Sequence, residues 1–122
     1  MDHKFENYLN EGNLLLNRAE EELNKPHEDV MTLAVCQGTK MAIDNYFKAY
    51  LLKHQVQNVE EGDLMTRYQQ CITFKPEFAK INLDSFDCIH DDKCSMSEYC
   101  MSINKVSECV KVAEDFRNLI YR

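Results

Sequence analysis

The chain has 122 residues, a length that suits one domain able to bury roughly two-thirds of the surface it exposes when unfolded. Its composition is 44% apolar and 29% charged, and only 3 Gly and 2 Pro leave few positions for turns, which favours a small number of long elements. The net charge of −7 excludes a protein that binds nucleic acid with its whole surface, because such binding depends on neutralising phosphates; any such contact must be local.

The chain holds six cysteines: Cys36, Cys71, Cys88, Cys94, Cys100 and Cys109. They would suggest disulfides after a secretory leader, but Met1 is followed by polar and charged residues, and no stretch approaches roughly 18 uncharged apolar residues. We therefore expect a cytoplasmic protein without membrane contact, whose cysteines act as small buried apolar residues. Cys88, His90 and Cys94 form one loose group of metal-ligand types, whereas zinc sites usually use two paired sets, so no metal is expected.

The first expected element is an amphipathic helix between Phe5 and Leu23. Its apolar residues recur at steps of three and four: Phe5, Tyr8, Leu9, Leu15, Leu16, Ala19 and Leu23. A second helix is expected from Pro26 to His54, because a proline suits a first turn, where its missing N–H would have no partner. Apolar residues point nearly all round this helix, so we expect it at the centre of a bundle, with a surplus face that is available to a second subunit.

Shorter elements are expected in the middle of the chain. Asp63 can cap a short helix, a further short helix is expected from Pro76 to Ile81, and an irregular loop is expected from Asn82 to Lys93. Ser95 and Glu98 have the spacing of a capping box, which predicts a long last helix that reaches the C-terminus.

These elements predict an all-α fold. We expect an antiparallel up-and-down helical bundle, with two long N-terminal helices, short middle helices and a long C-terminal helix, as a single domain over residues 1–122. The chain has no glycine-rich phosphate loop, no zinc-protease helix motif and no nucleophile elbow, so these residues indicate no common class of enzyme.

Arg117 is an anomaly in the last helix. It follows Ala113 by four residues and Val110 by seven, which returns it to the face predicted to be buried, where an unpaired charge is unfavourable. It therefore needs a carboxylate, an anion or a water-filled cleft. Asp44 is the conspicuous acid on the otherwise apolar second helix and is the candidate partner, and Lys48 stands one turn further along that helix.

Four short patterns lie along the chain. They are LLNRAEEEL at residues 15–23, AIDNYFKAYL at 42–51, GDL at 62–64 and FRNLIYR at 116–122. The first is similar to the run of leucines and the Arg-Ala-acidic stretch that open the HEPN family of helical bundles. The second resembles that family's acidic-x-x-x-Lys-Ala-x-Leu signature, and the third resembles its His-Asp-Leu entry to the third helix. The fourth resembles the Arg-Asn-x-x-x-His motif of the ribonuclease members.

The resemblance implies a compact bundle that forms a homodimer and is linked to nucleotidyltransferases or to RNA cleavage. It implies catalytic roles for Arg117, Asn118 and Asp44, and anion or nucleotide contacts for Lys48 and Arg122. The nuclease motif ends in histidine, whereas this chain has Arg122 at that position. Arginine stays protonated at neutral pH, so it can bind an anion but cannot take the proton from the ribose 2′-hydroxyl, which metal-free RNA cleavage requires.

We therefore predict a non-catalytic, dimeric HEPN-like module that uses no cofactor. Its expected partners are a nucleotide or RNA, bound locally, and a nucleotidyltransferase protein. Two alternatives stay open: a toxin-like ribonuclease that recruits its base from elsewhere, and a scaffold that only self-associates through the second helix. A plain Arg117–Asp44 ion pair without further function is the simplest interpretation of those two residues.

Overall fold

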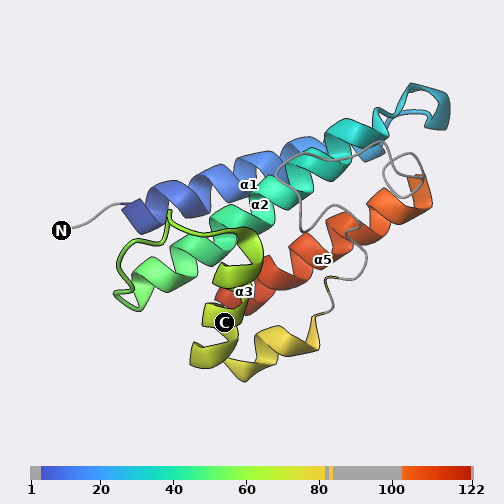
Figure 1. The fold of residues 1–122 in the computed structure, drawn as a ribbon. Helices are drawn as coiled ribbons and strands as arrows, with labels where there is room; N and C mark the ends of the chain where they lie inside the picture. The colour runs from blue at the N-terminus through green and yellow to red at the C-terminus, as the bar shows by residue number, and fades with distance from the viewer. Residues whose placement is uncertain (1–3, 82, 84–102, 122) are drawn as a thin grey trace.

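The computed structural model describes residues 4–81, 83 and 103–121. Within these residues the regular elements are all helices, and there is no strand (Figure 1). In chain order the elements are α1 (Lys4–Leu23), η1 (His27–Asp29), α2 (Thr32–Lys53), α3 (Leu64–Phe74), η2 (Pro76–Lys80) and α5 (Ile103–Tyr121), where η marks a 3₁₀ helix. The predicted all-α bundle, with two long N-terminal helices, short middle helices and a long last helix, is confirmed. The capping box predicted at Ser95 and Glu98 lies outside the described residues, as does nearly all of the loop predicted from Asn82 to Lys93.

α1 and α2 lie side by side and run in opposite directions (Figure 1). Two glycines lie where the helices come close together. A Cβ atom added to Gly12 would lie 3.3 Å from the Ala42 carbonyl oxygen, and one added to Gly38 would lie 3.8 Å from the Leu15 carbonyl oxygen. Gly12, the earlier residue of α1, therefore lies beside Ala42, and the later Leu15 lies beside the preceding turn of α2 at Gly38, which is the antiparallel order.

The second long helix begins at Thr32, so the predicted start at Pro26 was wrong. Pro26 instead opens a 3₁₀ turn, in which its carbonyl accepts a hydrogen bond from the Asp29 N–H at 2.8 Å. Met31 has a non-helical ψ of 87°, and its N–H donates to the Glu22 carboxylate at 3.0 Å. This hydrogen bond lowers the pKa of Glu22. The reversal of the chain thus uses residues whose pattern had suggested helix.

α2 is the centre of the bundle, as predicted, and it packs against α1, α3 and α5. The buried Phe47 ring shows why. Its centroid lies 5.8 Å from that of Tyr68 on α3, 6.1 Å from that of Phe78 on η2 and 4.9 Å from that of Phe116 on α5. One aromatic cluster therefore joins every described element that follows α2, at separations typical of aromatic pairs.

Three cysteines, Cys36, Cys71 and Cys109, are buried in the core, as expected. Burial raises the pKa of Cys71 to about 12, which makes this thiol unreactive at neutral pH. The other three cysteines lie outside the described residues. Among the helices that the structure describes, none is both long and apolar enough to cross a membrane.

α3 begins where the sequence predicts. The Asp63 carboxylate accepts hydrogen bonds from the Thr66 N–H at 2.9 Å and from the Thr66 hydroxyl at 2.8 Å, which together cap the helix and lower the pKa of Asp63. The buried residues of the helix are Leu64, Arg67, Tyr68 and Cys71. Its inner face therefore carries one arginine.

Candidate functional site

The residues predicted to form a site lie in separate parts of the bundle. Asp44 and Lys48 lie on the side of α2 that meets α3 and the first turns of α1. Arg117 lies next to Tyr46, and Asn118 borders a cavity beside η2. Arg122 is outside the described residues.

Asp44 binds Arg67 and not Arg117, which corrects the expected pairing. Arg67 Nε lies 2.5 Å from Asp44 Oδ1, and Arg67 Nη2 lies 2.9 Å from Asp44 Oδ2, in a two-point contact between fork and carboxylate. The reason is helix rotation. Asp44 precedes Tyr46 by two residues, about 200° around α2, so Asp44 faces α3 while Tyr46 faces α1 and α5.

Arg67 also donates hydrogen bonds to the backbone that leads into α3. Its side chain is only 6% exposed. Nη1 donates to the carbonyl oxygens of Val59 at 3.0 Å, Glu61 at 3.3 Å and Gly62 at 3.2 Å. The Asp44–Arg67 pair is therefore a clamp that holds the connection between α2 and α3, and both of its charges are already matched.

Lys48 lies on the edge of this clamp. Its Nζ is 3.9 Å from Asp44 Oδ2 and 5.4 Å from the centre of the Tyr8 ring. The Tyr8 hydroxyl donates to Glu60. Burial, and then this hydrogen bond, raise the pKa of Tyr8 to about 12, while the same bond lowers the pKa of Glu60.

A cavity of about 210 Å³ lies beside Tyr8 and Glu60. It is lined by Lys4, Tyr8, Leu52, Asn58, Val59, Glu60 and Glu61. Two carboxylates and one ammonium group face this space, so its charge does not favour a phosphate.

Arg117 takes part in a polar network between α1, α2 and α5. Its positive charge and a hydrogen bond to the buried Tyr46 hydroxyl both lower the pKa of that hydroxyl. That hydroxyl donates to Asn13 Oδ1 at 2.7 Å, and Asn13 Nδ2 donates to the Tyr121 hydroxyl at 3.0 Å. Burial is the main reason that the pKa of Tyr46 is raised.

Two glutamates complete this network, which we call the Arg117 cluster: Asn13, Glu20, Tyr46, Glu114, Arg117 and Tyr121. Glu114 on α5 shares a hydrogen bond with Glu20 on α1, and this bond, followed by burial, raises the pKa of Glu114 against the opposing charge of Arg117. A hydrogen bond between two carboxyl groups needs a proton on one of them. The guanidinium thus faces two acids, a setting that favours a proton or a cation over a phosphate.

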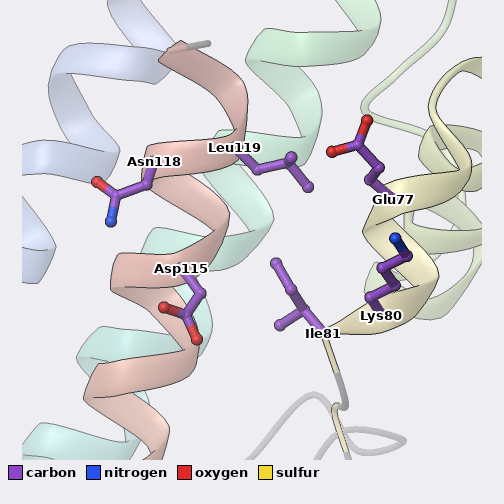
Figure 2. A pocket seen from close by; sticks show the side chains of 6 residues that line it. All are labelled: Glu77, Lys80, Ile81, Asp115, Asn118 and Leu119. Carbon is purple, nitrogen blue, oxygen red and sulfur yellow. The ribbon is translucent and has the colours of Figure 1, made fainter.

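Asn118 follows Arg117 by one residue and therefore points to a different side of α5. It borders a cavity of about 310 Å³ between α5 and η2, lined by Glu77, Lys80, Ile81, Asp115, Asn118 and Leu119. Figure 2 shows Leu119 and Ile81 pointing into this space from opposite walls, with Asn118 at its edge. Arg117 is not among the residues that line this cavity.

Sequence reasoning missed Arg67, although a usable signal exists. Leu64, Arg67, Tyr68 and Cys71 follow the spacing i, i+3, i+4, i+7, which places them on one face of a helix. The Glu20–Glu114 contact has no comparable signal, because it depends on how α1 and α5 are rotated against each other.

Among residues 4–81, 83 and 103–121, no group of three or more His, Cys, Asp or Glu side chains could hold a metal ion. The segment with Cys88, His90 and Cys94 lies outside these residues.

No protein-family model, no curated protein and no solved structure matches the chain.

Proposed function

We propose that the chain is a non-catalytic, HEPN-like module that acts by binding protein partners, including a second copy of itself. The observation that supports this most directly is the separation of Asp44 from Arg117. Metal-free RNA cleavage needs a base and a cation at the same phosphate. Asp44 has both carboxylate oxygens on Arg67, and Arg117 belongs to a different cluster.

A protein partner is favoured over RNA by the charges of the chain. The net charge is −7, and the cations that the resemblance assigns to ligand binding lie beside acids: Lys48 beside Asp44, and Arg117 beside Glu114 and Glu20. Phosphate binding needs positive charge in excess. The resemblance implies a nucleotidyltransferase as the class of partner.

RNA cleavage is the second candidate, and one observation favours it. Glu114 lies beside Arg117 and has a raised pKa, a shift in the direction that favours a carboxyl group in general acid and base chemistry. In this alternative Glu114 takes the place of the missing histidine and Arg117 holds the phosphate.

One assay separates the two. Purified wild-type protein, Arg117→Ala and Glu114→Gln are each incubated with structured RNA, and the products are separated on a denaturing gel. We expect no cleavage above the buffer blank. Lys111→Ala, which changes an exposed cation elsewhere on α5, is the matched control. Cleavage by the wild-type and Lys111→Ala proteins that disappears in the other two variants would reject the non-catalytic proposal.

A further inference from the structure

One face of α1 carries an apolar centre between two opposite charges. Glu11, Leu14, Leu15 and Arg18 have the spacing i, i+3, i+4, i+7 and therefore lie on one side of the helix. Glu11 and Arg18 are exposed, and Leu14 is 43% exposed despite its apolar side chain. Neither Glu11 nor Arg18 takes part in an ion pair or side-chain hydrogen bond within the described part of the chain.

This face points away from α5. Asn13 and Glu20 on α1 contact residues of α5. Glu11 and Arg18 precede them by two residues each, about 200° around the helix. α5 therefore does not cover the Glu11 and Arg18 side of α1.

Met41 of α2 extends the apolar centre, and it is 54% exposed. Lys48 contacts the Tyr8 ring, so these two residues mark the same side of the α1–α2 pair. Met41 precedes Lys48 by seven residues and Leu15 follows Tyr8 by seven, so Met41 and Leu15 return to that side. The close approach of Gly38 to the Leu15 carbonyl places them at the same level.

We propose that this surface, formed by Glu11, Leu14, Leu15, Arg18 and Met41, is the contact between two copies of the chain. The inference rests on the self-association included in the proposed function, and it names the surface. A two-fold axis that passes between Leu14 and Leu15 sets the two α1 helices antiparallel. Glu11 and Arg18 lie equally far from that axis, so each Glu11 then faces Arg18 of the second copy.

A second copy fits this surface because the surface is complementary to itself. A two-fold contact places the same patch on both sides, and here the rotation brings the negative end of one patch onto the positive end of the other. The two leucines and Met41 supply apolar area, and the two symmetric ion pairs set the orientation, as in antiparallel helix pairs.

The test uses the charges. Analytical ultracentrifugation at micromolar concentration compares the wild-type chain, Glu11→Lys, Arg18→Glu and the double variant Glu11→Lys/Arg18→Glu. Each single variant places like charges opposite each other in both symmetric positions, so we expect the dimer Kd to rise about tenfold or more. The double variant restores the pairing in reversed order and should return the Kd to within about threefold of wild type.

Two further variants complete the experiment. Lys111→Glu on α5 makes the same change in net charge as Arg18→Glu and should leave the Kd unchanged, whereas Leu14→Glu should give a monomer. A monomeric wild-type chain would overturn the interface, and so would single variants that dimerise normally or a double variant that stays dissociated. A monomeric wild-type chain would also remove the self-association included in the proposed function, whereas a dimer that ignores these charges would overturn only the assignment of this surface. Neither result depends on the RNA assay, which tests the non-catalytic part of the proposal separately.

Discussion

Arg67 joins α3, α2 and the connection between them through one guanidinium. Removing it in Arg67→Ala leaves the Asp44 carboxylate in a partly buried position without its main partner, and leaves three carbonyl groups without this donor. We expect the free energy of unfolding to fall by about 3 kcal/mol, measured by urea denaturation followed by circular dichroism.

Arg67→Lys is the matched control for this prediction. Lysine keeps the positive charge but lacks the planar fork that reaches both Asp44 oxygens and the backbone together. It should therefore recover only part of the lost stability. A loss below about 1 kcal/mol for Arg67→Ala would mean that the clamp is not a main support of the fold.

Arg117 and Arg67 also show what helical register can predict. Register places both arginines toward packed faces, and Arg117 is indeed half-buried while Arg67 is buried. Register does not say which of them meets Asp44, because that depends on the rotation of α2 between its neighbours. The site residues could therefore be identified as unusual from the sequence, but their partners could not.

At the scale of helices, the packing of α1 on α2 makes opposite predictions for two glycines. A Cβ atom at Gly12 would lie 2.9 Å from the buried Tyr46 ring, which is held by its hydrogen bond to Asn13, and 3.3 Å from the Ala42 carbonyl. A Cβ atom at Gly38 would meet only ordinary contacts, of 3.8 Å and longer.

Gly38→Ala should therefore raise the free energy of unfolding by about 0.5–1 kcal/mol, because alanine reduces the freedom of the unfolded chain and favours helix. Gly12→Ala has the same intrinsic benefit but forces the helices or the Tyr46 ring to move, so we expect a net loss of about 1–3 kcal/mol. Urea denaturation of both variants measures the difference. Equal stabilisation by both would show that α1 and α2 are not in close contact at Gly12.

Elements could be predicted from the sequence where their signals are local. The Asp63 cap and the start of α3 depend on residues three apart, and both are confirmed. The start of α2 was wrong because it depends on Glu22, which reaches across the turn to the Met31 N–H. This contact links the end of α1 to the residue before α2, so the helix propensities of residues 26–31 cannot predict where α2 begins.

Across the whole molecule, carboxyl groups respond to acid in opposite directions. Hydrogen bonds to Glu22, Glu60 and Asp63 lower their pKa values, so the stability they contribute falls as the pH falls through the acidic range. Glu114 behaves in the reverse way, because its pKa is raised in the folded chain. As the pH rises above the ordinary glutamate value of about 4.3, the unfolded chain releases this proton first, and the contribution of Glu114 to stability decreases.

Glu114→Gln isolates this effect, because glutamine keeps a hydrogen-bond donor for Glu20 at every pH. We expect the variant to be more stable than wild type at about pH 7, and the difference to shrink toward about pH 3.5, where the wild-type carboxyl is protonated in both states. Urea midpoints measured across this range test the prediction, with Glu21→Gln on the exposed side of α1 as the control that should show no such trend. A difference that is independent of pH would mean that Glu20 and Glu114 do not share a proton, and the raised pKa that favours Glu114 as a base for RNA cleavage would then be absent as well.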